Sequence, residues 1–234
     1  MTTIGILGTG RMGVRLADAF AKAGHEVVLA SRDLGRARHI AEGLGLPGIR
    51  PGTYEQAADA PFVLPAMFLR DGLVATLHAY RHQMAGKILI DITNPFNDDY
   101  SDFILPWDTS GAEELRRHFP ETRLVGAFKN VWWEVFDAPT FDGTVSDVFV
   151  VGDDQDAKHA FMKIAEPMPF RFIDAGRLAN ARIVERMTLL SGELGQRYHY
   201  FPRMNYRFVG EPWTPGRADR HNHLIQRSQE GMTP

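Results

Sequence analysis

The stretch TIGILGTGRMG, residues 3–13, decides which fold the chain can adopt. Its apolar first half predicts a buried strand, and Gly8, Gly10 and Gly13 follow in G-x-G-x-x-G spacing. The first glycine permits a tight turn, the second lets a pyrophosphate approach the backbone, and the third lets the next helix pack closely on the strand. Residues 14–24 then have helical spacing of apolar side chains. This order predicts a dinucleotide-binding unit with the phosphates at a helix N-terminus, the alternative being a glycine turn without a ligand.

Further along the chain, apolar runs that predict strands alternate with segments of helical spacing. Strands are expected within residues 26–31, 61–68, 87–95, 123–128, 148–154 and 170–176, and one of the intervening helices is expected over 73–84. Such alternation predicts an α/β protein of the Rossmann type, a doubly wound, mainly parallel sheet covered by helices on both faces. We expect this dinucleotide-binding domain over residues 1–176. A C-terminal helix and extended tail, residues 177–234, are expected to cover the pocket or to contact a second subunit.

Composition narrows the setting in which such a domain would work. The 234 residues carry a formal net charge of −3, so no general field draws in nucleic acid or an acidic membrane surface. Cysteine is absent, which excludes disulfides, thiol nucleophiles and thiolate metal sites and fits a reducing cytoplasm. No apolar run is long enough to span a bilayer, and no basic segment precedes the first apolar residues as in a signal peptide. We therefore expect a cytoplasmic protein without a nucleic-acid or membrane partner.

The segment VVLASRDLGRARH, residues 27–39, bears on the choice of dinucleotide. At the end of the second strand, an acidic residue would bind the 2′-hydroxyl of NAD but would repel the 2′-phosphate of NADP. This chain has Ser31 and Arg32 there, and Arg36 lies one helical turn further on. A hydroxyl and a guanidinium fork suit a phosphate, so the segment predicts NADP(H), the alternative being an exposed basic helix end. Asp33 is expected to cap the helix rather than to bind ribose.

Six segments share their sequence and order with one family of reductases. They are GILGTGRMG, ASRDLGRA, DITNPF, SGAEEL, VVGDDQDAK and IDAGRLANARIVE, and they run from residue 5 to residue 185. On these motifs the chain resembles the NADPH-dependent 8-hydroxy-5-deazaflavin (coenzyme F-420) reductases. The resemblance implies a compact Rossmann-type oxidoreductase, often a homodimer, that passes hydride between NADP(H) and the deazaflavin.

Carried over position by position, the resemblance implies one set of residues that hold NADP(H), and the chemistry of other residues indicates a second set for the substrate pocket. NADP(H) would be held by Gly8, Thr9, Gly10, Arg11, Met12, Gly13, Ser31, Arg32, Arg36, Leu64, Pro65, Thr93, Asn94 and Pro95. The second-substrate pocket would be lined by Lys129, Trp132, Trp133, Asn180 and Arg182. Core packing is the favoured alternative for the two tryptophans, and a polar outer helix face explains Asn180 and Arg182 nearly as well. Where many family members read V-K-A-F-N-T, this chain has VGAFKNVWW, so Gly126 stands at the usual lysine and Lys129 at the usual asparagine.

The expected chemistry limits which side chains are needed. Hydride transfer between two rings depends on their alignment, because the cofactors carry the chemistry themselves, so no catalytic triad is required. Reduction of a carbonyl or imine would also need a proton donor. Lys129 is the best-placed candidate for that donor, with Tyr198 and Asp174 behind it, unless it is a surface or salt-bridged lysine.

Three functions follow from these alternatives. The first is hydride transfer between NADP(H) and a deazaflavin. The second is NADPH-dependent reduction of an imine, a dehydroamino acid or another small metabolite, and the third is a non-catalytic NADPH-binding sensor. No metal site is expected: His78 and His82 could share a helix face without a third ligand nearby, and His221 and His223 are expected to be polar coil.

Overall fold

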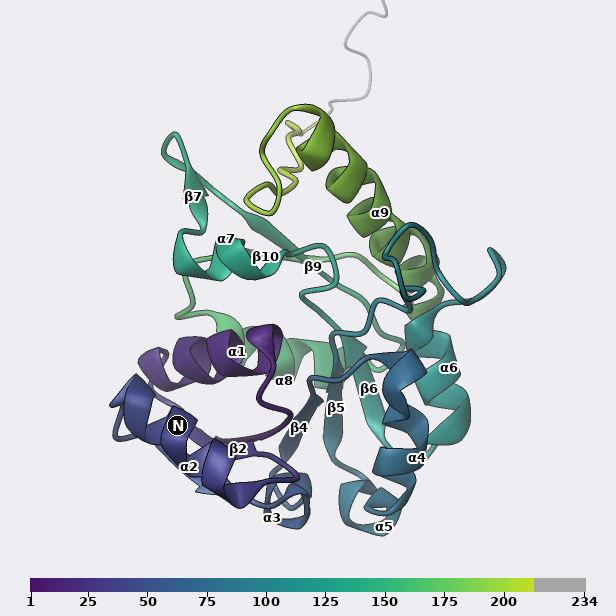
Figure 1. Ribbon diagram of the computed structural model, residues 1–234. Coiled ribbons are helices and arrows are strands. Elements are labelled where there is room, and N and C mark those ends of the chain that lie inside the picture. Colours follow the sequence, from purple (N-terminus) through teal and green to yellow (C-terminus); the bar gives the residue numbers. More distant parts are fainter. Residues whose placement is uncertain (213–234) are drawn as a thin grey trace, which may run out of the picture.

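The computed structural model describes residues 1–212 of the chain. Its centre is a sheet of six parallel strands in the order β3-β2-β1-β4-β5-β6 (Figure 1). The strands are β1 (Thr3–Leu7), β2 (Glu26–Ala30), β3 (Ile49–Gly52), β4 (Phe62–Pro65), β5 (Ile88–Asp91) and β6 (Arg123–Gly126). The order reverses between β1 and β4, and in such sheets the carboxyl ends of the strands at that point open into a ligand crevice. The predicted Rossmann-type fold is confirmed.

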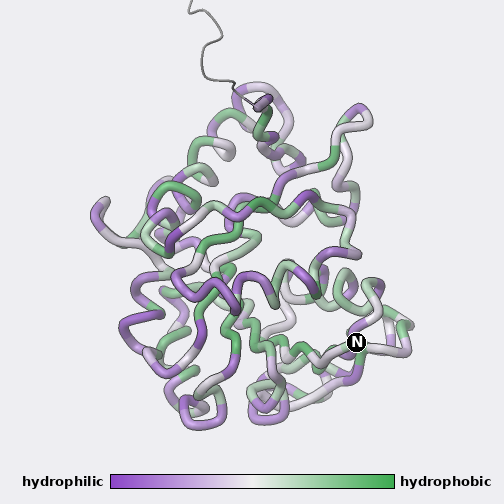
Figure 2. Tube along the Cα trace, turned by 180° about the vertical axis from the view of Figure 1, so that it is seen from behind, coloured by the Kyte–Doolittle hydropathy of each residue, from purple (hydrophilic) through white to green (hydrophobic). Residues whose placement is uncertain are grey.

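Helices cover both faces of this sheet. One face packs against α1 (Arg11–Lys22), α2 (Leu34–Leu44) and α8 (Gln155–Ala165), and the other against α3 (Tyr54–Ala58), α4 (Leu73–His78), α5 (Arg81–Met84), α6 (Gly111–His118) and the start of α9 (Ala181–Arg197). Successive residues of a strand point to opposite faces, so Val27 belongs to the first core and Val28 to the second. Figure 2 shows hydrophobic segments along the central strands and hydrophilic segments along the outer turns.

Two of the strands after β6 form a separate small sheet. β9 (Asp147–Val150) and β10 (Arg171–Asp174) pair in parallel with each other, and an antiparallel bridge between Gly126 and Val151 connects them to β6. Because that bridge is antiparallel, β9 does not extend the parallel sheet, which differs from the expectation of one sheet. Between β6 and β9 in the sequence, the chain forms α7 (Trp133–Asp137) and a hairpin of β7 (Thr140–Phe141) and β8 (Thr144–Val145). No pattern in the sequence predicts these three elements.

Two further differences concern short elements. The helix expected over residues 73–84 is divided into α4 and α5, because Tyr80 leaves the helical conformation (φ −118°, ψ 11°). His78 and His82 therefore lie on separate helices, and the ring of His78 packs edge-on against that of His118, with centroids 5.5 Å apart. The short β3 and α3 were also not predicted, since runs of four and five residues carry little periodicity.

The start of the helix α9 packs against the central sheet. The short turns η1 (Leu69–Asp71) and η2 (Leu178–Asn180) lie outside the regular helices, and α9 begins directly after η2. Ala181 and Val184 of α9 belong to the second core of the sheet. The domain boundary between residues 176 and 177 stays a prediction, and the tail from residue 213 onward, with His221 and His223, lies outside the described residues.

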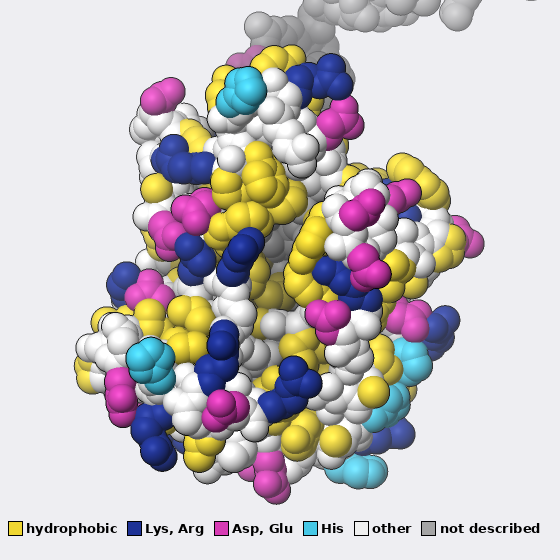
Figure 3. Space-filling model, in the orientation of Figure 1, with side chains coloured by type: hydrophobic (Ala, Val, Ile, Leu, Met, Phe, Trp, Pro, Cys, Tyr) yellow, Lys and Arg dark blue, Asp and Glu magenta, His cyan; other side chains and the backbone are white. Residues whose placement is uncertain are grey.

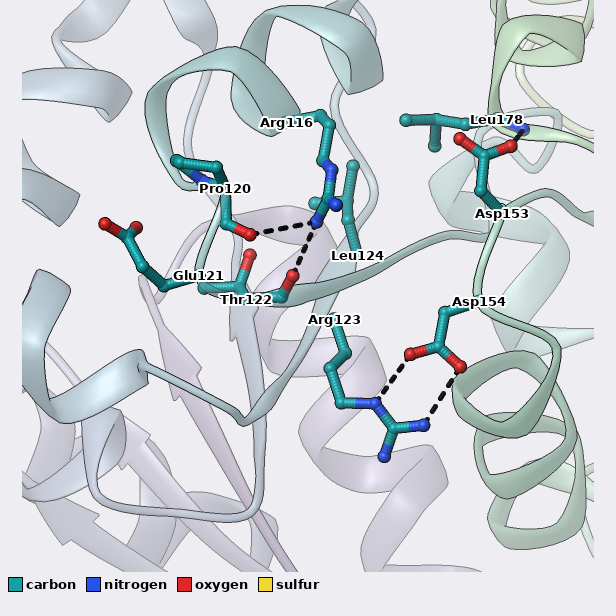
Figure 4. A pocket seen from close by; sticks show the side chains of 9 residues that line it. All are labelled: Arg116, Pro120, Glu121, Thr122, Arg123, Leu124, Asp153, Asp154 and Leu178. Carbon is teal, nitrogen blue, oxygen red and sulfur yellow. Dashed lines mark hydrogen bonds and ion pairs between the residues drawn. The ribbon is translucent and has the colours of Figure 1, made fainter.

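A polar pocket of about 230 Å³ lies at the amino end of β6 and the start of α8, at the opposite end of β6 from the crevice (Figure 4). Arg123 donates two hydrogen bonds, of 2.7 and 2.9 Å, to the carboxylate of Asp154. Asp154 also accepts the N–H of Ala157 and so caps α8. On the other side, Arg116 donates to the Thr122 carbonyl oxygen at 2.7 Å. The pocket is built from contacts that hold α6 and α8 in place.

Acid titration tests the Arg123–Asp154 pair. The hydrogen bonds from Arg123 and from the Ala157 N–H hold the pKa of Asp154 at about 2, below its usual value of 3.8. Because folding lowers this pKa, the pair stabilises the fold above the unfolded pKa, and the stabilisation is lost as the pH falls toward 2. Carboxyl-carbon NMR should give a midpoint near 2 in the parent and one closer to 3.8 in Arg123→Gln. Arg117→Gln removes a partner of a different carboxylate, Glu114, and should leave the Asp154 midpoint unchanged. A midpoint near 3.8 in the parent would contradict the Arg123–Asp154 pair.

Candidate functional site

The glycine turn between β1 and α1 has the geometry that a dinucleotide phosphate requires. Gly8 has φ 128°, and a Cβ there would lie 2.6 Å from the Ala66 carbonyl oxygen. A Cβ on Gly13 would lie 2.1 Å from the Gly8 oxygen, so neither position accepts a side chain. Beside Gly10 there is open space, and no side chain of the described residues caps α1. The first N–H groups of α1 are therefore open to an anion, which fits the pyrophosphate of a dinucleotide.

The basic residues expected at the end of β2 gather beside this turn. Arg36 donates from Nε to Thr9 Oγ1 (2.9 Å) and from Nη2 to the Thr9 carbonyl oxygen (3.1 Å), which ties α2 to the turn. Asp33 accepts N–H groups in the first turn of α2 and caps the helix, as predicted. Its own N–H donates to Ser31 Oγ at 3.2 Å, and Arg32 is exposed. With Asp33 used as a cap, Arg32 and Arg36 leave this end of the sheet positively charged.

The crevice lies on the face shown in Figure 3. That surface is hollowed between the layer that carries α1 and α2 and the part that carries α7 and α9. Lys and Arg side chains lie along its lower border, and apolar side chains gather above it. Leu64 and Pro65 are buried at the end of β4 beside β1, and Met12 packs against the core from α1. Met12 therefore keeps partly exposed apolar surface near the glycine turn, whereas Leu64 and Pro65 are enclosed in the fold.

Thr93, Asn94 and Pro95 follow β5 at the same edge of the sheet. The Asn94 side-chain amide donates to the Lys129 carbonyl oxygen (2.7 Å), which fixes its orientation. Asn94 Oδ1 and Thr93 Oγ1 are buried and have no hydrogen-bond partner among residues 1–212. Buried polar atoms without partners are unfavourable. The two atoms therefore fit a ligand that supplies hydrogen-bonding groups, such as the carboxamide of a nicotinamide.

The ammonium group of Lys129 is completely buried between two carboxylates. Its Nζ lies 2.6 Å from Asp91 Oδ2 and 2.8 Å from Glu185 Oε1, and it donates to the Thr93 carbonyl oxygen at 2.6 Å. All three charged side chains are 0% exposed. Burial by itself would lower the pKa of Lys129, but the two carboxylates outweigh it and raise the pKa above its ordinary value. Lys129 therefore stays protonated.

The structure contradicts the prediction that Lys129 lines the substrate pocket or donates a proton there, because its side chain has no exposed surface. The Lys129 side chain instead packs against the Cα of Gly126. A Cβ added to Gly126 would lie only 3.0 Å from Lys129 Cε. The lysine stem from position 129 thus fills the space beside position 126. Sequence reasoning missed both acidic partners, although Asp91 ends an apolar strand and Glu185 lies on the buried side of α9, which are signals of a buried charge.

Trp132 and Trp133 are half-buried around the start of α7. The Trp132 indole N–H donates to Ser191 Oγ of α9 (2.9 Å), where Gly192 leaves room for the ring. The Trp133 ring faces the guanidinium of Arg11, the first residue of α1, at 4.7 Å from the ring centroid. Both indoles therefore remain candidates for the second-substrate pocket.

Asn180, just before α9, and Arg182, in its first turn, both have partners within the fold. The Asn180 amide donates to the Ala175 carbonyl oxygen at 2.7 Å. Arg182 pairs with Glu113 of α6, with Nε and Oε2 2.8 Å apart. These contacts use both side chains within the fold, so the structure gives no support to their expected place in the pocket.

The two further proton-donor candidates are also engaged elsewhere. Asp174 lies 2.6 Å from Lys158 Nζ, beside α8. The Tyr198 ring stacks on that of Tyr200, with centroids 6.1 Å apart, after the end of α9. Neither contact belongs to the crevice, so neither residue gains support as a proton donor.

The described part of the chain has neither a candidate metal site nor a candidate membrane-spanning helix. Residues 1–212 contain no group of three or more His, Asp or Glu side chains arranged to hold a metal ion. None of the helices in that range is both long and apolar enough to cross a membrane.

Fold and site together define a dinucleotide-binding protein of the Rossmann class. Residues 3–95 match the family model described as NADP oxidoreductase coenzyme F420-dependent. An F420-dependent NADP reductase from Methanothermobacter marburgensis is 33% identical over 198 residues, which cover 78% of this chain and 87% of that protein. The chain belongs to this family of NADP oxidoreductases, as its motifs predict.

Two other relatives extend the comparison. Metalloreductase STEAP3 of Rattus norvegicus is 33% identical over 187 residues, 80% of this chain, but the chain spans only 36% of that protein's length. A crystal structure from Arthrobacter sp. FB24, provisionally assigned as an F420-dependent NADP reductase, matches with a TM-score of 0.80 at 25% identity. The match covers 90% of this chain and 100% of that one.

Removal of the buried ammonium tests the Lys129 cluster. Lys129→Met leaves two carboxylates buried without a cation, and breaking a buried ion pair in this way costs about 3–5 kcal/mol of unfolding free energy. Urea unfolding followed by tryptophan fluorescence measures that loss. Lys158→Met is the control, because Lys158 is also buried but its partner Asp174 is 45% exposed and can be solvated, so a smaller loss is expected. Parent-like stability of Lys129→Met would contradict the cluster.

Proposed function

We propose that this protein transfers hydride between NADP(H) and the deazaflavin coenzyme F420. The observation that carries the proposal is the charge at the end of β2. Arg32 and Arg36 stand where a protein specific for NAD would have an acid, and Asp33 is used as a helix cap. The family and the names of its relatives support the same pair of substrates.

We assign NADP(H) to the crevice at the carboxyl ends of β1, β2, β4 and β5. The residues assigned to it are Gly8, Thr9, Gly10, Arg11, Met12, Gly13, Ser31, Arg32, Arg36, Leu64, Pro65, Thr93, Asn94 and Pro95. Open space at Gly10 supports pyrophosphate binding there. The positive charge of Arg32 and Arg36 suits the 2′-phosphate, and the unpaired Oδ1 of Asn94 suits the carboxamide.

Hydride transfer between two rings requires little acid–base chemistry from the protein. When bound, the nicotinamide supplies the hydride chemistry. The residues of the crevice bind and orient the two rings and exclude water. Lys129 is enclosed in its ion pairs, and Asp174 and Tyr198 have other contacts. This arrangement favours transfer between two rings over reduction of an imine or carbonyl, which needs a proton donor.

A spectroscopic assay tests the proposed function. When the purified protein is mixed with NADPH and oxidised F420, the absorbance of both should decrease together. NADPH consumption with an imine or another small metabolite, and none with F420, would contradict the deazaflavin as substrate. Tight NADPH binding without turnover in any of these mixtures would indicate a sensor.

Arg32→Ala tests the assignment of the 2′-phosphate. Loss of one charge-assisted pair should weaken NADP⁺ binding by about 1.5–3 kcal/mol, roughly ten- to a hundredfold, and leave NAD⁺ binding little changed. Arg38→Ala is the matched control, because Arg38 is exposed on the same helix and is not assigned to the site. Calorimetric titration measures the affinities of the parent and both variants for NAD⁺ and NADP⁺. Equal affinity of the parent for NAD⁺ and NADP⁺ would contradict the assignment.

We also propose that the protein is a homodimer in the cytoplasm. The resemblance to the deazaflavin reductases supports the dimer, and the lack of cysteine supports the compartment. Exposed apolar side chains on α9, at Ile183, Leu190 and Leu194, offer a surface for the second subunit. Sedimentation equilibrium measures the mass in solution, and a monomer at micromolar concentration would contradict the dimer.

A further inference from the structure

After α9 the chain turns back on the helix, and the returning segment, residues 199–208, is named the strap. The N–H groups of Tyr200 and Phe201 both donate to the Gly195 carbonyl oxygen, at 2.7 and 3.0 Å. A Cβ on Gly195 would lie 3.3 Å from Phe201 Cα and 2.7 Å from Met204 Cε. The strap therefore crosses α9 at close range, at a position where the helix has no side chain.

One buried carboxylate holds the far end of the strap. Asp147, at the start of β9, is 0% exposed and accepts two hydrogen bonds from Arg171, at 2.6 and 2.7 Å. It also accepts the N–H of Phe208 (2.6 Å) and a hydrogen bond from Arg207 (3.2 Å), both in the strap. Burial by itself would raise the pKa of Asp147, but these donors outweigh it and lower the pKa, so the carboxylate stays charged.

Further hydrogen bonds repeat this attachment. The Asp147 N–H donates to the Tyr206 carbonyl oxygen at 3.3 Å, and the Asn205 amide donates to the Asp147 carbonyl oxygen at 3.1 Å. The Tyr206 hydroxyl donates to the Met187 carbonyl oxygen of α9 at 2.8 Å. The strap is thus fixed both to the small sheet and to α9.

Held in this way, the strap places Phe201 against two indoles. Its ring meets Trp132 and Trp133 edge to face, with centroids 5.0 and 5.6 Å apart, and remains 39% exposed. We name Trp132, Trp133 and Phe201 the aromatic wall. The wall thus joins α7 to the strap.

The aromatic wall reaches both ends of the crevice. Trp133 contacts Arg11, which directly follows the glycine turn. Trp132 contacts Phe96, with ring centroids 6.2 Å apart, and Phe96 directly follows Pro95 at the end of β5. The wall therefore extends between the places assigned to the pyrophosphate and to the nicotinamide.

We propose that the strap completes the site of the second substrate: the aromatic wall binds a flat, fused-ring hydride acceptor, and Asp147 positions the wall by holding the strap. This inference rests on the proposed function and specifies where its second ring binds. Aromatic side chains stack on flat conjugated rings and lose little conformational freedom in doing so. A small imine or carbonyl compound offers no ring face of comparable size.

Phe201→Ala tests the wall, and Asp147→Asn tests its support. With NADP(H) saturating, the KM and Kd for oxidised F420 should rise about tenfold in both variants. The kcat at saturating F420 and the Kd of NADPH should stay within about twofold of the parent. Phe201→Tyr retains the ring and should behave as the parent. Phe208→Ala is the control, because this side chain is 65% exposed on the same strap and should change neither constant.

Quenching of tryptophan fluorescence separates failure of the wall from failure of the proposed function. It measures binding of F420, and of riboflavin as a second flat tricycle, to the NADP⁺-loaded protein without any turnover. Weaker quenching in Phe201→Ala than in the parent supports the wall even if no hydride passes to F420. Parent-like binding of both compounds by Phe201→Ala, or binding of neither by the parent, overturns the wall. Should Asp147→Asn fail to fold, Phe201→Ala alone decides.

Discussion

The buried charge of Lys129 joins the elements that surround the crevice. Its ammonium group can be buried because it forms ion pairs with Asp91 and Glu185. Backbone N–H groups also donate to both carboxylates. Asp91 accepts the N–H of Thr93 at 2.7 Å and shapes the turn after β5. Glu185 accepts two N–H groups at the start of α6, at 2.8 and 3.1 Å. The sheet, α6 and α9 are therefore connected through one cluster, in which a lost partner cannot be replaced by water.

The anchored α9 in turn supports one border of the crevice. Its small residues Ser191 and Gly192 receive Trp132, and Gly195 lets the strap cross. The opposite border is formed by the glycine turn and α2, which adjoin each other through Arg36 and Thr9. In the proposed function, one border offers charge and open N–H groups to phosphates, and the other offers aromatic rings to a flat substrate.

Features set by neighbouring residues could be predicted from the sequence, and features set by distant ones could not. Gly8 is required by close contacts at the turn, and Asp33 caps the helix that follows it directly, so the glycine turn and this cap were predicted correctly. The surroundings of Lys129 were missed because its partner Glu185 lies 56 residues away, and helical spacing does not show what a helix face meets. The attachment of the strap was missed for the same reason. Asp147 lies 61 residues before Phe208, and it holds the strap by hydrogen bonds, which leave no hydrophobic pattern in the sequence.

Hydride transfer itself is measured most directly by following deuterium from NADPH to the deazaflavin. NADPH labelled at both C4 positions, incubated with oxidised F420 and the protein in ordinary water, gives a product whose mass reports the origin of the transferred hydrogen. Direct transfer between aligned rings predicts reduced F420 that carries deuterium on the ring carbon. Unlabelled reduced F420, or oxidation of NADPH without any reduced F420, would contradict it.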